Sequence, residues 1–279
     1  MTKRATRTTR PGEADYLKAY DPTASPPFAL TVDLTIFTIQ GGVLTALLVE
    51  RGDHPYKGFW ALPGGHVAHG KENAETAAVR ELAEETGLNW AATGGHLEQL
   101  ATYSDPDRDP RIKAGLHVAS VAYVAFAPHL PDPQAGSDAT SARYWPIDDL
   151  DIEAQADAWH ARTPYAGDAP TLGYDHAVIL RDGLERVRAK LEYTTLAAQF
   201  VHEPFSLGDL RRVYEAAWGQ APELGNFRRK VLSTDGFVVP VERADRPATV
   251  AGGRPPLLYR RGPAQWLVPP MMRQSSLED

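Results

Sequence analysis

The sequence has no cysteine among its 279 residues, and it has no apolar run near the roughly 18 to 20 residues that a membrane-spanning helix requires. The absence of thiols excludes disulfides and thiolate metal sites, and it fits a reducing intracellular setting. The N-terminal stretch is basic but has no apolar centre, which argues against a secretory signal. We expect a soluble, cytoplasmic protein that is long enough for two domains.

Basic residues are fewer than acidic ones, 29 against 36, which gives a net charge of −7. The basic residues are, however, unevenly distributed along the chain. Residues 21–194 carry 13 basic and 25 acidic side chains, whereas 195–273 carry 11 and 7, and 1–20 carry 5 and 2. Phosphate attraction acts over only about 10 Å at ordinary salt, so a local excess matters more than the total. The two basic ends are compatible with nucleic-acid binding, although a mildly basic segment is common and does not establish it.

The first half of the chain alternates strand patterns with a helix. Its β-branched and aromatic residues predict strands at 28–39, 45–51, 117–127 and 142–150. A helix is predicted from about 73 to 86, ended by a glycine that suits the left-handed cap position. Strands with an inserted helix predict an α+β sandwich.

The second half begins with a helical pattern after Asp175, which suits the N-cap position. In FSLGDLRRVYEAAWG, Ser206 precedes Asp209 by three residues, the spacing of a capping box with aspartate in place of glutamate. A break at 219–222 separates this helix from a second one, ELGNFRRKVLS. Two strands joined by a long loop follow.

This order of elements is typical of a winged helix-turn-helix, whose second helix enters the DNA major groove. We expect Leu224, Phe227 and Val231 to face inward on that helix. The predicted DNA contacts are Asn226, Arg228, Arg229 and Lys230 on the helix, Arg243, Arg246 and Arg254 in the wing, and Arg4 and Arg7 in the N-terminal arm. Such modules also mediate protein contacts, and basic helices are often only solvated surfaces.

Three glutamates, Glu81, Glu84 and Glu85, are spaced i, i+3 and i+4 in RELAEETGL, so their carboxylates share one helix face. An oxygen-rich cluster of this kind suits Mg²⁺ or Mn²⁺, and Arg80 can neutralise part of its charge. Gly65, in a glycine pair, allows the backbone to pass close to the cluster. A solvated acidic helix face is the alternative interpretation.

The stretch WALPGGHVAHGKENAETAAVRELAEETGL resembles the signature of the Nudix hydrolases, which cleave nucleoside diphosphates linked to another group. The resemblance implies that Glu81, Glu84 and Glu85 are metal ligands and that Glu84 or Glu85 helps to activate the attacking water. It also implies that the carbonyl of Gly65 adds a ligand.

One position departs from that signature. The family pattern has a glutamate six positions after the glycine that matches Gly65, but here Lys71 stands at that position and Glu72 follows it. Because a displacement of about 1 Å in a catalytic group can cost ~100-fold in rate, this departure puts turnover in question.

From residue 28 to about 262, the chain resembles the Nudix-related transcriptional regulators called NrtR. The resemblance rests on the Nudix signature followed by DHAVIL, KLEYTTLA, FSLGDLRRVYEAAWG and NFRRKVL. It implies a Nudix domain that senses ADP-ribose or a related NAD metabolite and a winged helix that represses genes of NAD biosynthesis and salvage. It also implies a homodimer on a palindromic operator, and it leaves hydrolysis open because some members keep this activity and others have lost it.

The effector pocket is predicted from chemistry. Arg108 and Arg111 in YSDPDRDPR carry planar forks that suit a diphosphate, and Asp109 can accept hydrogen bonds from ribose hydroxyls. Arg51 is a further phosphate candidate, and Phe59 or Trp60 is a candidate for stacking on adenine, although Trp60 suits the core equally well. Arg80 completes the predicted ligand-binding set.

The leading hypothesis is a repressor that ADP-ribose releases from DNA. We divide it into a flexible basic arm and linker (1–27), a Nudix-like effector domain (28–174), a connecting helix (175–202) and a winged helix DNA-binding domain (203–273). The competing hypothesis is a Mg²⁺-dependent ADP-ribose pyrophosphatase whose C-terminal module only dimerises it. A regulator that slowly hydrolyses its own effector is the third.

Overall fold

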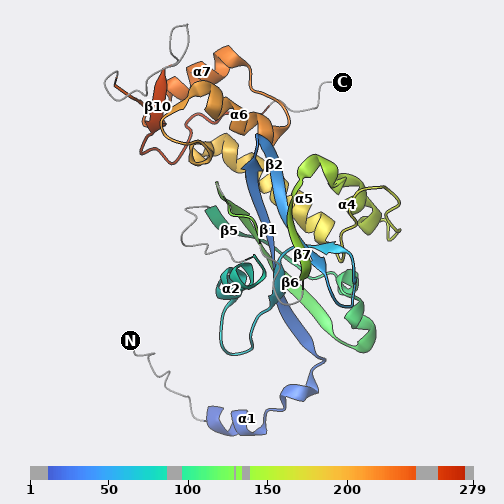
Figure 1. The fold of residues 1–279 in the computed structure, drawn as a ribbon. Helices are drawn as coiled ribbons and strands as arrows, with labels where there is room; N and C mark the ends of the chain where they lie inside the picture. The colour runs from blue at the N-terminus through green and yellow to red at the C-terminus, as the bar shows by residue number, and fades with distance from the viewer. Residues whose placement is uncertain (1–11, 87–95, 129, 134–138, 243–256, 274–279) are drawn as a thin grey trace.

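The computed structural model describes residues 12–86, 96–128, 130–133, 139–242 and 257–273, and in the helix that ends at Thr86 it describes side chains as far as Glu84. A mixed sheet forms the centre of the first domain (Figure 1). Its strands are β1 (Phe28–Gln40), β2 (Val43–Arg51), β3 (Trp60–Ala61), β4 (Gly64–His66), β5 (His96–Tyr103), β6 (His117–Phe126) and β7 (Ala139–Pro146).

The strand order is β3-β2-β1-β6-β5, with β4 also paired to β1 and β7 also paired to β2. The hairpin of β1 and β2 is antiparallel, as two strands joined by the Gly41-Gly42 turn must be. By contrast, β1 and β6 run parallel over ten residue pairs, from Phe28 opposite His117 to Phe37 opposite Phe126. β1 therefore lies at the centre of the sheet, and its residues Thr31 and Asp33 line the cavity described below.

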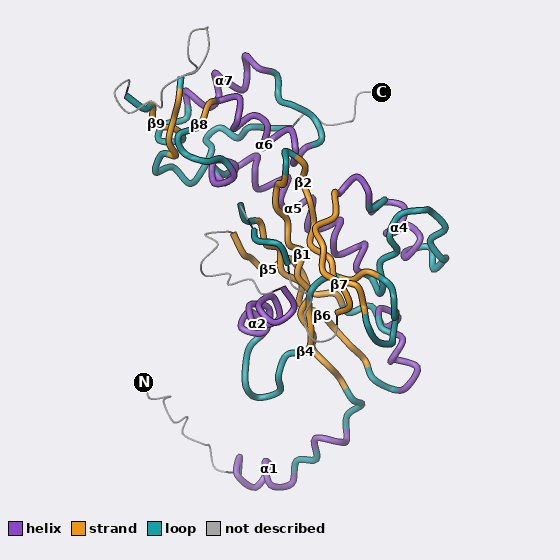
Figure 2. Tube along the Cα trace, viewed as in Figure 1, coloured by secondary structure: helices purple, strands orange, loops and turns teal. Residues whose placement is uncertain are grey.

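Helices cover both faces of this sheet (Figure 2). The helical elements of the domain are α1 (Glu13–Ala19), α2 (Ala74–Thr86), α4 (Ile152–His160) and α5 (His176–Tyr193), with short 3-10 turns at Pro22–Ala24, Pro106–Arg108, Pro110–Ala114 and Ile147–Asp149. Ala78 and Leu82 of α2 pack on one face with Leu34. Ile179 and Leu184 of α5 pack on the other face, so the predicted α+β sandwich is confirmed.

The C-terminal domain is a winged helix. After a 3-10 turn (Leu196–Phe200), it contains β8 (Phe205–Ser206), α6 (Leu207–Trp218), α7 (Leu224–Ser233), β9 (Val238–Pro240) and β10 (Leu258–Arg261). The three strands form a separate sheet in the order β8-β10-β9. The predicted capping box is present, because Ser206 accepts from the amide of Asp209 and the Asp209 carboxylate accepts from the amide of Ser206.

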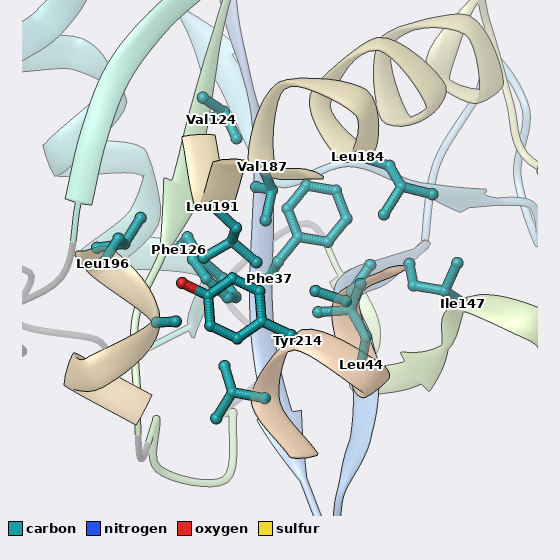
Figure 3. Packing of buried hydrophobic residues seen from close by; sticks show 14 of the residues in the cluster. Phe37, Leu44, Val124, Phe126, Ile147, Leu184, Val187, Leu191, Leu196 and Tyr214 are labelled. Atoms are coloured by element: carbon teal, nitrogen blue, oxygen red, sulfur yellow. The ribbon is translucent and has the colours of Figure 1, made fainter. Parts of the chain in front are cut away.

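One hydrophobic core joins the two domains. Tyr214 of α6 lies in the same buried cluster as Phe37 of the β1–β2 hairpin and Leu191 of α5 (Figure 3). The rings of Phe126 and Phe200 stack with centroids 3.7 Å apart and extend this contact to the 3-10 turn. The winged helix is thus packed onto the end of the sheet and onto α5, so the two domains share a buried interface.

Several expectations need correction. Leu224 is 63% exposed, so only Phe227 and Val231 of the predicted inward trio are buried in α7. The stretch expected to be a flexible arm and linker contains α1, whose acidic first turn and basic last turn favour a helix although it buries no residue. The helix α4 and the strand β5 were not predicted. No helix of the described residues is long and apolar enough to cross a membrane.

The hydroxyl of Tyr214 is buried in the shared core and has no hydrogen-bond partner among the described residues, and burial raises its pKa. Replacing Tyr214 with phenylalanine removes this unsatisfied group, so we expect a stability gain of about 1 kcal/mol and a rise in Tm of about 2 to 4 °C in calorimetry. The matched change Tyr144→Phe should lower Tm, because the Tyr144 hydroxyl donates to the carbonyl of Pro131 at 3.2 Å. Equal shifts in both variants would contradict this account.

Candidate functional site

A cavity of about 270 Å³ opens in the first domain between β1, the loops after β2 and β5, and the start of α5. Most of its lining residues are polar or charged. They are Thr31, Asp33, Arg51, Asp53, His54, Pro55, Leu62, Gly64, Gly65, His66, Arg108, Asp109, Arg111, Val118, Tyr174 and His176. Four of the predicted ligand-binding residues, Arg51, Arg108, Asp109 and Arg111, are therefore brought together.

Arg108 forms the inner wall of this cavity. Its guanidinium is bidentate to Asp175, with Nε–Oδ2 and Nη2–Oδ1 distances of 2.9 and 2.8 Å, and Nη2 also donates to Oδ2 of Asp33 at 3.0 Å. All three side chains are less than 10% exposed. Much of the planar fork expected to hold a diphosphate is thus engaged in a buried ion cluster, because two carboxylates in a low-dielectric site need a cation between them.

The environment of the cluster shifts the pKa values of its two carboxylates in opposite directions. Burial favours the neutral form of Asp33, but His176 and Arg108 outweigh it and hold its pKa well below the usual range. Burial dominates at Asp175 and raises its pKa, although Arg108 opposes the shift. Asp33 thus has two cationic or polar partners, Arg108 and His176, whereas the hydrogen bonds of the Asp175 carboxylate within the described residues are the two from Arg108.

His176 is fixed in one orientation beside this cluster. Its Nδ1 accepts a hydrogen bond from the amide of Leu62 at 2.9 Å, which places the ring proton of the neutral form on Nε2. Nε2 lies 3.5 Å from Oδ1 of Asp33. Asp33 and His176 were not predicted, although Asp33 is the single charged residue in an apolar strand and that is a signal for a buried partner.

Two arginines remain nearer the cavity mouth. Arg111 pairs with Asp109, its Nη2 lying 2.6 Å from Oδ2, and its side chain is still 35% exposed. Arg51 donates from Nε to the carbonyl of Pro55 at 2.8 Å, and its guanidinium lies over the ring of Tyr174. Both cations are accessible to an anionic ligand.

The aromatic residues of the site differ from those predicted. Trp60 does not line the cavity, because it packs edge-on against Trp145 with ring centroids 5.1 Å apart. Tyr174 lines the cavity, and its ring lies 4.6 Å from that of Tyr56, which in turn contacts Phe59. Tyr174 and Tyr56 both have positive φ angles, 56° and 63°, a strained backbone that is found most often at functional sites.

Arg80 forms ion pairs with two glutamates of α2 and with one that precedes the helix. Its guanidinium donates to Glu72, Glu81 and Glu84 at 2.7 to 2.9 Å and to the carbonyl of His66. Arg80 does not line the cavity, so its place is in the charge balance of this helix rather than against the predicted effector. Burial raises the pKa of Glu81, although the Arg80 guanidinium opposes this.

The extra residue before Glu72 is absorbed by a turn. Lys71 donates its amide to the carbonyl of Ala68, and Gly70 takes a φ of 68°, which few other residues adopt easily. The amide of Ala68 in turn donates to Glu72 at 2.8 Å. Glu72 therefore still reaches Arg80, with Nη2 of Arg80 lying 2.7 Å from Oε1 of Glu72.

Gly65 lies against the carboxylate of Glu81. A Cβ atom at Gly65 would stand 2.3 Å from Oε1 of Glu81, so any larger residue here would require the Glu81 carboxylate to move. Across the described residues no three His, Asp or Glu side chains are grouped so as to hold a metal ion. The third predicted ligand, Glu85, has its side chain outside the described part of α2.

The predicted DNA-reading helix is α7, and its polar residues face solvent. Asn226, Arg228 and Arg229 are exposed, whereas Lys230 is half-buried at the edge of a groove against the C-terminal segment. Glu223 caps the helix by accepting from the amides of Gly225 and Asn226. The predicted contacts Arg243, Arg246, Arg254, Arg4 and Arg7 lie outside the described residues.

Comparison with known proteins identifies both domains. A profile for the NUDIX domain matches residues 27–166, half of the chain, and one for the NrtR DNA-binding winged helix domain matches 197–261. The fold and the glutamate helix thus define a Nudix protein. The chain belongs to the Nudix family, in the branch of Nudix-related regulators that carry an NrtR-type winged helix.

Full-length relatives share this arrangement. The ADPR responsive transcriptional repressor NtrR of Acinetobacter baylyi is 29% identical over 89% of this chain and 88% of its own length. A MutT/nudix family protein from Enterococcus faecalis is 26% identical with a TM-score of 0.67, covering 91% of this chain and 95% of that one.

The NrtR of Shewanella oneidensis is similar as well. Its structure complexed with a 27mer DNA is 28% identical with a TM-score of 0.59, covering 85% of this chain and 97% of that one. The structure of its NUDIX domain complexed with ADP ribose is 31% identical with a TM-score of 0.50, covering 63% of this chain and 98% of that one.

The ion pair of Glu72 with Arg80 predicts a pH dependence. Hydrogen bonds from Arg80 and from the Ala68 amide lower the pKa of Glu72 from 4.5 to about 2. Because the folded-state pKa is depressed, the stability from this pair is present above the ordinary pKa and is lost as pH falls toward the folded value. The Tm difference between the wild type and Glu72→Gln should be largest near pH 7 and should narrow below pH 4.5. Glu75→Gln, a change of a nearby exposed glutamate on α2, should show no such dependence.

Proposed function

We propose that this protein is a DNA-binding transcriptional repressor of NAD biosynthesis or salvage genes, and that its Nudix domain binds ADP-ribose or a related NAD metabolite and thereby modulates operator binding. The observation that carries the proposal is the course of α5, which starts in the cavity wall at His176 and ends in the core of the winged helix at Leu191. A repressor must share a compartment with its operator, in agreement with the predicted cytoplasmic location.

Ligand recognition at the cavity is assigned by charge and exposure. Arg51 and Arg111 are the accessible cations, so they are the primary candidates for the diphosphate. Asp109 is buried against Arg111 and can accept from a ribose hydroxyl only with its remaining lone pairs. Tyr174 replaces Trp60 as the candidate for stacking on the base.

DNA recognition is assigned to α7 and its surroundings. Arg228 and Arg229 suit guanine or phosphate, and Asn226 suits adenine. Lys230, the wing arginines and the arm are proposed to hold phosphate. Two winged helices in a homodimer would read the two halves of a palindrome.

The DNA-binding proposal predicts nanomolar, salt-sensitive binding to promoter DNA that ADP-ribose relieves. The double variant Arg228→Ala, Arg229→Ala should lose at least about 100-fold in affinity in a gel shift, because each base or phosphate contact contributes on the order of 1 to 3 kcal/mol. The protein's own upstream region is the first probe to use.

The matched control removes two positive charges elsewhere. Lys113 and Arg143 are exposed on the Nudix domain, and their double alanine variant should bind DNA like the wild type. If the α7 variant binds as tightly as the wild type, α7 is not the reading helix. If the wild type ignores DNA at all salt concentrations, the repressor proposal fails.

A second candidate function is Mg²⁺-dependent hydrolysis of ADP-ribose, and the close fit of Gly65 against Glu81 favours it. Glu81, Glu84 and Glu85 would hold Mg²⁺ or Mn²⁺ with the Gly65 carbonyl, and the metal would supply Lewis-acid activation of the diphosphate and of water. In the structure Arg80 holds Glu81 and Glu84, so metal binding would compete with these two ion pairs.

The hydrolase alternative predicts AMP release from ADP-ribose and Mg²⁺ at a rate that falls at least about 100-fold in Glu84→Gln, since this removes a charged ligand or base. Glu75→Gln on the same helix serves as the control and should retain the rate. The assay is chromatography of nucleotides at high protein concentration. Absence of AMP from the wild type would eliminate this candidate and leave sensing alone.

A further inference from the structure

Asp175 occupies the N-cap position of α5 but does not cap the helix. Its side chain makes no capping hydrogen bond, although aspartate is among the best N-cap residues. The reason is that both carboxylate oxygens accept from Arg108. Arg108 and the first turn of α5 therefore compete for the same carboxylate.

The competition takes place in the wall of the effector cavity. Arg108, Tyr174 and His176 all line the cavity, and Asp175 lies between the last two. Arg108 serves two carboxylates with one positive charge, because Asp33 is its other partner. An anionic ligand that draws Arg108 toward itself would break its two hydrogen bonds to Asp175 and free that carboxylate, whereas Asp33 would keep His176 as a partner.

The far end of α5 is fixed to the DNA-binding domain. Arg188 donates to the carbonyl of Ala217, and the indole of Trp218 donates back to the carbonyl of Arg188 at 3.2 Å. Arg273 of the C-terminal segment pairs with Glu185 of α5. Two residues earlier, the amide of Met271 donates to the carbonyl of Glu192. Since α5 is one continuous helix, it connects the cavity wall to the contacts that hold α6 and the C-terminal segment (Figure 1).

Resting on the proposed function, we propose that Asp175 is a two-position switch: its carboxylate pairs with Arg108 in the DNA-binding state, and it caps the first turn of α5 when a diphosphate ligand engages Arg108. The two positions exclude one another because the carboxylate, oriented toward Arg108, makes no hydrogen bond to the first turn, so it must turn away from Arg108 to cap the helix. A ligand that binds the capped state better than the paired state shifts the population toward it, and DNA binding weakens accordingly.

The test replaces Asp175 with asparagine in the full chain. Asparagine caps helices well but carries no charge to hold Arg108, so Asp175→Asn should resemble the ligand-bound state. We expect it to bind DNA about tenfold more weakly without ADP-ribose, to respond less to ADP-ribose, and to bind ADP-ribose at least as tightly as the wild type. Gel shift and titration calorimetry measure these quantities. The variant leaves Arg108 balanced by Asp33, so it should fold.

Asp182→Asn is the matched control. Asp182 also lies on α5 and accepts from the Tyr103 hydroxyl at 2.8 Å, but it does not line the cavity. It should keep the wild-type response. A similar loss of response in both variants would mean that any disturbance of α5 has this effect, and it would overturn the switch.

Hydrogen exchange in the wild type supplies a test that needs no variant. The amide of Val178 already donates to the backbone carbonyl of Asp175 at 2.9 Å. The cap would therefore protect chiefly the amide of Ala177, so ADP-ribose should slow its exchange several-fold. Unchanged exchange there, or weaker ADP-ribose binding by Asp175→Asn, would overturn the proposal. If the wild type binds no DNA or does not respond to ADP-ribose, the proposed function is wrong. If the wild type and Asp175→Asn respond equally to ADP-ribose, only the switch is wrong.

Discussion

The buried guanidinium of Arg108 is the constraint on which the effector half depends. It joins β1 through Asp33, the loop after β5 through its own backbone, and the start of α5 through Asp175. Three segments distant in sequence therefore meet at one charge that cannot be removed without stranding two carboxylates in the interior. The cluster sets the inner wall of the cavity, and it leaves the accessible cations, Arg51 and Arg111, to face a ligand.

The second constraint is the continuity of the core. Phe37, Leu191 and Tyr214 come from the sheet, from α5 and from the winged helix, yet they pack in one cluster. An interface of this kind resembles a domain interior more than a contact between independent modules, so the two domains of one subunit should move together. In the proposed homodimer, a signal from the cavity would change how the two subunits present their α7 helices, provided that the ligand binds the two arrangements with unequal affinity.

Periodicity and local chemistry predicted most of the fold. The spacing of Ser206 and Asp209, the glycine turn after β1 and the apolar runs of β1 and β6 each specify a local structure, and all three formed as expected. The site was harder to predict, because its central contacts join residues 67 and 75 positions apart. Arg108 was predicted to bind a diphosphate, because the sequence does not show that Asp33 and Asp175 both pair with it. For Trp60 the sequence left base stacking and the core as equal alternatives, because its partner Trp145 lies on a strand distant in sequence.

The four-residue turn from Ala68 to Lys71 has a broader implication for how such chains are recognised. An additional residue changes the distance along the chain between Gly65 and Glu72, yet the left-handed Gly70 loops it out and the ion pair with Arg80 survives. The ion pair that follows the turn is kept, although the number of residues between Gly65 and Glu72 differs from the signature. Searches that insist on a fixed count would pass over proteins whose helix and charge network are intact.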